Sequence, residues 1–320
     1  MFFNSTEEIR EFLPVSNGIE FSRLKPHLQI VEQTYIRPLF GKELLIELDH
    51  FQSGQTPSGE HAQLLSLIRS AEIHLVYWLG YDVLNSYISD GGFRRIETDK
   101  IKGLYKYQED NLKEYFKTTG FNSLDNCLEF IEENIEALAS FRQSETWKAL
   151  NVSFIPDTKT FNSIYFINNS RLIFLRLLGF FTIIEDLYLK PVMGDHLTFI
   201  RSELAKETPE AKVTAIIPFI RKPLAFLAVS MLMEESGADL SDKGLYFEGK
   251  TSTFSNDATK QPTSNERITE LTKRTKALGE SYLVQLKEYL IANATAWNNY
   301  TAPKSGLHNR DNTAKKTFWV

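Results

Sequence analysis

The first copy of the stretch that decides the fold reads Glu32-Gln-Thr-Tyr35-Ile-Arg37-Pro38-Leu-Phe-Gly41-Lys-Glu-Leu44. The second copy, 153 residues later, reads Glu185-Asp-Leu-Tyr188-Leu-Lys190-Pro191-Val-Met-Gly194-Asp-His-Leu197. Both follow the pattern E-x-x-Y-[IL]-[RK]-P-x-x-G-x-x-L. A pattern of this length that recurs once indicates an internal repeat, which has to be recognised before any other feature is interpreted.

Two further blocks recur in the same order. Residues 88–93 align with residues 240–245 at an offset of 152. Beyond a longer loop in the second half, the offset becomes 159, and four residues match four others: Leu112, Gly120, Leu124 and Ile131 with Leu271, Gly279, Leu283 and Leu290. Leu75 also aligns with Leu227. Three ordered blocks at a nearly constant offset predict two diverged copies of one unit.

Apolar residues recur at helical spacing in both halves. Steps of three and four residues predict amphipathic helices and occur in four series: Leu24, Leu28, Val31 and Tyr35; Leu64, Ile68, Ala71, Leu75 and Trp78; Ile217, Ile220, Leu224, Leu227 and Met231; Ile268, Leu271, Thr275, Leu278 and Tyr282. Pro223 should kink or interrupt its helix. A small β-hairpin is possible at residues 92–98 and 244–254. The sequence therefore predicts an all-α fold of two helical bundle units.

The repeat also predicts the domain boundaries. Residues 1–152 form the first helical repeat, and residues 153–169 form a linker in which Pro and Asn interrupt the pattern. Residues 170–297 form the second repeat, which contains a long polar loop at 240–265. Residues 298–320 have no helical period and are expected to be an extended tail.

Composition and charge narrow the class of protein. The chain has 320 residues, enough for two domains, and its 42% hydrophobic and 24% charged residues are typical of a globular protein. A net charge of −5 argues against specific nucleic-acid binding, which needs clustered cations, although DNA could pass through a ring of such subunits. The apolar stretches 172–184 and 216–233 contain Arg and Lys, so we expect buried helices and no membrane contact.

Motifs for catalysis, cofactors or metals are lacking in the sequence. The phosphate-loop, dinucleotide and Gly-x-Ser-x-Gly patterns are absent, and the six histidines show no zinc-ligand spacing. Cys127 is the single cysteine and lies on a helical pattern, where a buried, inert thiol is expected. We therefore expect no enzyme activity, no cofactor and no metal site.

The repeated motif allows two interpretations. Glu32 and Glu185 each precede a tyrosine and a basic residue, so a catalytic Glu–Tyr pair is one. The other, which we favour because both copies keep the residues, is structural: Glu bonds to Tyr, Arg or Lys near a helix end, and Pro-x-x-Gly sets the next turn. The structural motif then comprises Glu32, Tyr35, Arg37, Pro38 and Gly41 with Glu185, Tyr188, Lys190, Pro191 and Gly194.

The end of the tail is aromatic. Phe318, Trp319 and Val320 follow a segment in which Lys and Arg outnumber Asp. Large aromatic side chains are costly to leave in water, so docking onto a neighbouring subunit or another partner is one interpretation. A frayed terminus is the other.

The segment between the copies brings a resemblance. It contains Trp147-Lys-Ala-Leu, then Phe161-Asn-Ser-Ile-Tyr-Phe-Ile-Asn-Asn-Ser170-Arg171-Leu-Ile-Phe174-Leu, then Glu185-x-x-Tyr188-Leu-Lys190-Pro191-x-x-Gly194. These motifs resemble an uncharacterised family encoded by Bacteroidetes phages and prophages, commonly among the virion structural genes. Most of the chain shares the resemblance. Such helical proteins are similar in style to the head–tail connector (adaptor) proteins of tailed phages.

The resemblance implies a virion neck component, assembled in the bacterial cytoplasm, that forms an oligomeric ring beside the portal and contacts tail or neck proteins. Two other functions stay open from the residues alone. One is a helical enzyme or regulatory protein with a site in the cleft between the two repeats. The other is a bacterial scaffold protein that binds a partner helix.

Overall fold

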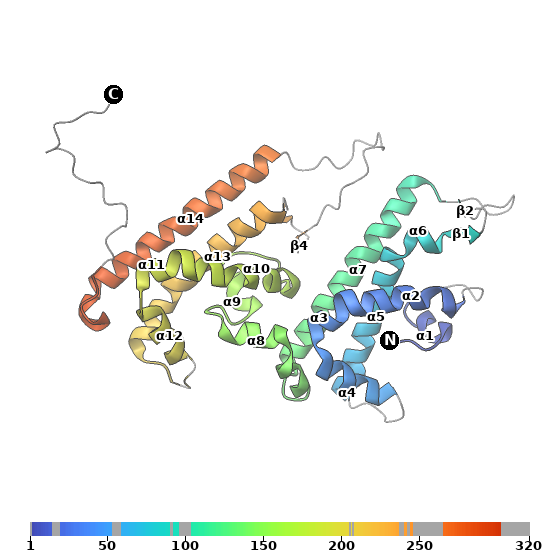
Figure 1. The fold of residues 1–320 in the computed structure, drawn as a ribbon, viewed down its shortest axis with the longest axis horizontal. Coiled ribbons are helices and arrows are strands. Elements are labelled where there is room, and N and C mark those ends of the chain that lie inside the picture. The colour runs from blue at the N-terminus through green and yellow to red at the C-terminus, as the bar shows by residue number, and fades with distance from the viewer. Residues whose placement is uncertain are drawn as a thin grey trace. The chain divides into compact units, whose positions relative to one another are not determined.

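The chain is mostly helical in the computed structural model (Figure 1). The structure describes residues 2–14, 20–52, 59–89, 92–95, 104–204, 206, 208–236, 240–241, 244–245 and 265–301. The chain divides into two compact units. Unit 1 comprises Met1–Thr158 and Asn169–Leu175, and unit 2 comprises Lys159–Asn168 and Arg176–Val320.

Unit 1 is built around a long helix pair. Its elements in chain order are α1 (Thr6–Arg10), α2 (Phe21–Val31), the π-helical turn η1 (Glu32–Ile36), α3 (Arg37–Phe40), α4 (Lys42–Gln52), α5 (Gly59–Leu79), α6 (Tyr81–Leu84), β1 (Ser86–Ser89), β2 (Gly92–Arg95), α7 (Lys106–Glu133), the 3₁₀ turn η2 (Ala139–Gln143) and α8 (Glu145–Val152). The long helices α5 and α7 pack against each other.

Unit 2 repeats most of this order of elements, without counterparts of α6 and α8 among the described residues, and its helix α10 begins in the segment Asn169–Leu175 that groups with unit 1. After α9 (Thr158–Ile164) come α10 (Arg171–Ile184), the π-helical turn η3 (Glu185–Leu189), α11 (Lys190–Met193), α12 (His196–Leu204), α13 (Ala211–Ser236), β3 (Leu240–Ser241), β4 (Gly244–Leu245), α14 (Asn265–Ala292) and the 3₁₀ turn η4 (Ala294–Trp297). The long pair here is α13 with α14, so α13 corresponds to α5 and α14 to α7.

One close contact is the same in the two long pairs. A Cβ added to Gly120 of α7 would lie 2.7 Å from the Leu75 side chain of α5. A Cβ added to Gly279 of α14 would lie 2.8 Å from the Leu227 side chain of α13. Both glycines therefore let two helices approach closely, at positions that the sequence repeat aligns.

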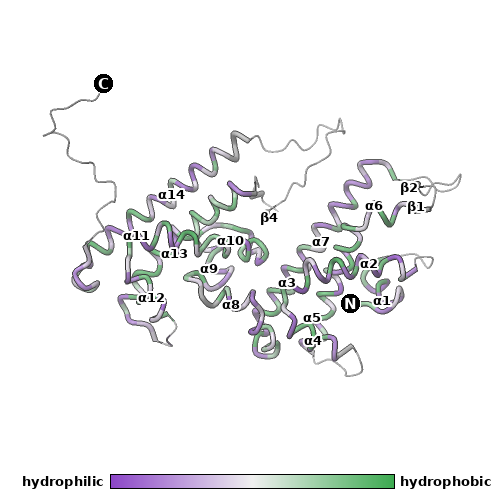
Figure 2. The backbone as a smooth tube through the Cα atoms, viewed as in Figure 1, coloured by the Kyte–Doolittle hydropathy of each residue, from purple (hydrophilic) through white to green (hydrophobic). Residues whose placement is uncertain are grey.

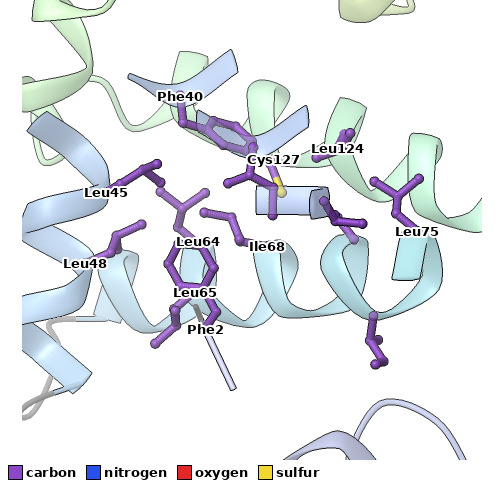
Figure 3. Packing of buried hydrophobic residues seen from close by; sticks show 14 of the residues in the cluster. Phe2, Phe40, Leu45, Leu48, Leu64, Leu65, Ile68, Leu75, Leu124 and Cys127 are labelled. Carbon is purple, nitrogen blue, oxygen red and sulfur yellow. The ribbon is translucent and has the colours of Figure 1, made fainter. Parts of the chain in front are cut away.

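The core of unit 1 lies between α3, α4, α5 and α7. In Figure 3, Phe40, Leu64, Ile68 and Cys127 point toward one another, from α3, α5 and α7. All four side chains are fully buried. Cys127 is thus a core residue as predicted, and burial raises the pKa of its thiol, which makes it a poor nucleophile.

The predicted helical faces are largely confirmed. Alternating hydrophilic and hydrophobic residues along α7 and α14 mark amphipathic helices in Figure 2. Leu24, Leu28 and Val31 are buried on α2. On α14, however, Leu278 is 41% exposed, and the buried face runs through Thr272, Thr275, Leu286 and Leu290. The reason is Gly279, whose contact with Leu227 turns that face of the helix toward α13.

Pro223 does not interrupt helix α13. It runs from Ala211 to Ser236 without a break, with Pro218 and Pro223 inside. Among the described helices, α13 is long and apolar enough to cross a membrane. Of its most apolar 18-residue stretch, however, 67% is buried inside the protein. The buried core helix of a globular protein has the same length, composition and burial.

Short antiparallel strand pairs occupy the same place in each unit. Ser86 lies opposite Arg95 in one pair, and Leu240 lies opposite Leu245 in the other. The remainder of the predicted hairpin segments, residues 96–98 and 246–254, lies outside the described residues, as does most of the 240–265 loop. The segment expected as a linker, 153–169, contains α9 and buries Phe154, Ile155 and Phe161.

Candidate binding cleft and apolar surface

The repeated motif forms the same backbone corner in both units. Pro38 and Pro191 lack the backbone N–H that an α-helix would use, and a five-residue π-helical turn ends two residues before each of them. The N–H of Arg37 accordingly donates to the carbonyl of Glu32, five residues back, and Lys190 does the same toward Glu185.

Each corner ends at a glycine with positive φ, as expected of a turn that only glycine adopts without strain. The φ angle is +80° at Gly41 and +56° at Gly194. The two motif tyrosines are both partly buried. In unit 1, the ring of Tyr35 packs edge-to-face on Phe121, with 5.7 Å between centroids.

The motif glutamates have different partners. In unit 1, the Glu32 carboxylate lies 3.9 Å from the Arg37 guanidinium, a partner that the sequence predicts. In unit 2, Glu185 instead forms an ion pair and hydrogen bond with Arg201 of α12. Burial raises the pKa of Glu185, and the charge of Arg201 opposes this shift. Lys190 pairs with Asp186 at 3.8 Å.

An open cleft of about 670 Å³ lies at the corner of unit 2. Its walls come from the α11–α12 corner, the start of α13 and the segment after α14. The lining residues are Val192, Met193, Gly194, Asp195, His196, Phe199, Glu210, Lys212, Ala296, Trp297, Asn298, Asn299, Tyr300 and Thr301. This volume is in the range of small-molecule and peptide sites.

One wall of the cleft is aromatic. Trp297 is buried, and its ring meets His196 edge-on at 5.7 Å and Phe199 at 6.5 Å between centroids. The Lys212 ammonium lies 4.9 Å from the Phe199 centroid and 5.6 Å from that of Trp297. Cation–π contacts of this kind hold a lysine over the rings, so this wall is already packed together.

The rim of the cleft is polar. Asp195 and Glu210 are exposed, and Glu210 lies 3.0 Å from the Lys212 ammonium. Asn298 and Asn299 have left-handed backbone, with φ of 50° and 56°, a conformation that asparagine tolerates best after glycine. The rim therefore offers carboxylate and amide groups to a bound molecule.

The equivalent corner of unit 1 is covered by α8 and the residue before it. A Cβ added to Gly41 would lie 2.8 Å from the Ser144 Cβ, whereas none of the described residues lies within 4 Å of the same point on Gly194. The Thr146 hydroxyl donates to the Leu39 carbonyl at 2.9 Å. The cleft is thus open in unit 2 where unit 1 is closed.

A second feature is an apolar surface on the first half of α7, in unit 1. Its residues, called the α7 surface below, are Leu104, Tyr105, Tyr107, Leu112 and Tyr115. Tyr105 and Tyr107 are 72% and 59% exposed, and their rings stack 6.0 Å apart. Large exposed aromatic side chains of this kind mark interaction surfaces.

The sequence prediction missed both features. The α7 surface has a signal in the sequence, because Tyr105, Leu112 and Tyr115 are spaced by seven and three residues and so share a helix face. The sequence signal for the cleft is weaker. At the offset of 159, Trp147 of α8 corresponds to Gly306, so a glycine stands in the second copy where the first has a tryptophan. The predicted docking residues Phe318, Trp319 and Val320 lie outside the described residues.

Metal and thiol chemistry receive no positive support. Among the described residues, no group of three or more His, Cys, Asp or Glu side chains is placed to hold a metal ion. The cleft does bring Asp195, His196, Glu210 and Lys212 to one place, and these can bind or exchange protons with a ligand.

Comparison with known proteins finds a match to one family model. A model described as a family of unknown function (DUF6712) matches residues 36–149 and residues 177–310. The first segment lies in unit 1 and the second in unit 2. No curated protein and no solved structure matches the chain.

Proposed function

The chain belongs to the family of unknown function DUF6712, and we propose that it is a structural virion protein, a head–tail connector of a tailed phage. In this proposal copies of the chain form an oligomeric ring beside the portal and contact the tail or neck proteins. The resemblance of residues 147–194 to virion-associated phage proteins gives the setting, and the α7 surface is the observation on which the assembly role depends.

The α7 surface has the composition of a protein–protein interface. Tyrosine supplies a large contact area with little conformational freedom to lose, and it is enriched at interfaces. Tyr105, Tyr107 and Tyr115 are all more than half exposed. Around them, Lys106 pairs with Asp110 at 2.7 Å and Lys113 with Asp82 at 2.6 Å. An apolar centre with a charged rim is the usual arrangement of such a surface.

A second copy of the chain is the partner proposed for the α7 surface. The corresponding positions of unit 2 differ in sequence: at the offset of 159, Tyr107 corresponds to Glu266 and Tyr115 to Arg274. The two units descend from a duplication in this account, and only the first has kept or gained an assembly face. The acidic balance of the chain also suits a ring through which DNA passes without being held.

Electron microscopy of the full-length protein, alone and with the portal protein encoded beside it, tests the proposal. We expect rings for the wild type and for Val284→Lys, a control at an exposed apolar position of α14. We expect their loss in Tyr105→Lys/Tyr107→Lys, which removes both members of the stacked pair. Rings that persist in the double variant, or a wild type that binds no portal and forms no ring, would contradict the proposal.

The cleft of unit 2 favours a second candidate, a ligand-binding or enzymatic role. Its four ionisable residues, Asp195, His196, Glu210 and Lys212, do not recur in the first copy. The sequence placed such a site between the repeats, whereas this cleft lies within one unit. A metabolite that raises the unfolding temperature of the wild type but not of Asp195→Asn/His196→Gln would support this role.

A further inference from the structure

The Pro-x-x-Gly corners of the two units are surrounded by the same set of hydrogen bonds, called the frame below. Asn134 follows α7 and Asn293 follows α14, and each amide donates to a carbonyl four residues back at 2.9 Å. Leu39 and Val192, aligned by the repeat, both accept a hydroxyl through their carbonyls. The donor to this carbonyl is the Thr146 hydroxyl in unit 1 and the Tyr300 hydroxyl in unit 2.

In unit 1, the residues that follow this frame along the chain fold back over the corner at Gly41. Ser144 sits directly over Gly41, and Trp147 packs on Phe141 with 6.2 Å between ring centroids. The cover is therefore supplied by the residues that follow η2, within the same unit. In unit 2, the corresponding chain reaches the cleft at Thr301, which is one of the lining residues.

We infer that residues 302–310 of the same chain bind in the cleft of unit 2, in the place that Ser144 and α8 take in unit 1. At the offset of 159, Ser144 corresponds to Pro303 and Thr146 to Ser305. The second family match extends to residue 310 and the first to residue 149, so the family model includes this part of the repeat in both units.

Charge favours this occupant. Residues 302–310 (Ala-Pro-Lys-Ser-Gly-Leu-His-Asn-Arg) contain Lys304 and Arg310 and no acidic residue. The Asp195 carboxylate is exposed on the rim of the cleft, whereas Glu210 on the same rim pairs with Lys212 at 3.0 Å. Asp195 is therefore the acidic group proposed to meet Lys304 or Arg310. Leu307 supplies an apolar side chain for the aromatic wall.

The inference bears on the proposed assembly without depending on it. With residues 302–310 bound, residues 311–320 lead from the cleft to the aromatic tip. Ten residues span at most about 35 Å, so the aromatic tip at 318–320 would reach partners only within that distance of the α11–α12 corner.

Disulfide trapping in the full-length chain tests the inference. Under mild oxidation, we expect Asp195→Cys/Ser305→Cys to form an intramolecular disulfide quickly, because bridged Cα atoms must lie within about 7 Å. Glu280→Cys/Ser305→Cys is the control, with its first cysteine at an exposed position of α14. This control should form at least tenfold less intramolecular disulfide. Ala296→Cys/Ser305→Cys serves as a second pair if the first does not fold. Native Cys127 is buried.

Two outcomes would overturn the inference. One is a cleft pair that closes no faster than the control. The other is a disulfide that joins two chains and none within a chain, which would make a second copy the occupant. Placing the pairs in the Tyr105→Lys/Tyr107→Lys background keeps this result separate from the fate of the ring proposal.

Discussion

At the scale of single residues, two prolines determine the local geometry of the repeated motif. Pro38 and Pro191 cannot donate a backbone hydrogen bond, and the turn before each is π-helical. The sequence predicts a turn at Pro-x-x-Gly, and the positive φ of Gly41 and Gly194 agrees with it. It does not predict the π-helical turn, because the displaced hydrogen bonds depend on how the helix continues beyond the proline.

A buried carboxyl group gives a prediction at this scale. Glu72 of α5 is fully buried, and burial raises its pKa to about 8, with the negative charge of Glu32 adding to the shift. In the unfolded chain this carboxyl ionises near its ordinary value of 4.5. The folded state therefore binds more protons between these values, and stability falls as the pH rises through this window.

We expect the wild type to lose about 3 kcal/mol of unfolding free energy from this group between pH 5.5 and pH 8. Glu72→Gln, which cannot ionise, should remove that loss, whereas Glu43→Gln at an exposed position should leave it in place. Urea denaturation of the three proteins at the two pH values measures this. Equal pH dependence in wild type and Glu72→Gln would show that Glu72 is not buried as described.

At the scale of helices, the long pairs α5–α7 and α13–α14 depend on glycine. Gly120 and Gly279 lie where an added Cβ would meet a leucine side chain within 3 Å and the leucine backbone nitrogen at 3.2 Å. The backbone nitrogen cannot move without moving its helix. Overpacking of this kind costs about 1–3 kcal/mol, more than the roughly 1 kcal/mol that alanine gains over glycine inside a helix.

Gly120→Ala and Gly279→Ala should each lower the unfolding free energy by up to about 2 kcal/mol, the overpacking cost less the gain from alanine's helix propensity. Gly179→Ala on α10 is the matched control, because no residue in the described part of the chain lies within 4 Å of its added Cβ. That control should be neutral or stabilised by up to about 1 kcal/mol. Chemical denaturation of the three variants measures these changes in unfolding free energy. A gain of stability in all three would mean that the helix pairs are not in close contact.

Much of the helical architecture is predictable because both copies repeat the same spacing. Leu75 with Gly120 and Leu227 with Gly279 are aligned by sequence and in contact in the structure. Other features depend on contacts that no local pattern encodes. Arg201 pairs with Glu185 from the next helix. The sequence likewise did not predict that Glu132 pairs with Arg171 at 3.1 Å, since 39 residues separate them.

At the scale of the whole molecule, the two units are informative where they differ. Unit 1 has a closed corner and an exposed aromatic surface on α7, and unit 2 has an open cleft. The sequence repeat aligns what the units share, so it predicted the common helices and the repeated motif and neither of these features. A partner-specific role is expected in the segments that are not shared.

Removal of the aromatic tip gives a prediction at this scale. A chain lacking Thr317–Val320 should keep the unfolding temperature of the wild type, because the sequence from residue 298 onward has no helical period and is not expected to form a core of its own. It should lose association with the portal or tail protein, since Phe318 and Trp319 are proposed to dock there. Pull-down with the portal protein and a thermal melt measure the two effects, and normal assembly of the truncated chain would make the tip dispensable.

Sedimentation velocity of the full-length wild type tests the central claim, assembly through the α7 surface, most directly. The account predicts a species several times the 36.8 kDa mass of the chain, its share rising with concentration, and a single 36.8 kDa species for Tyr105→Lys/Tyr107→Lys with an unchanged melting temperature. A wild type that remains at 36.8 kDa at every concentration, or a double variant that assembles as the wild type does, would contradict it.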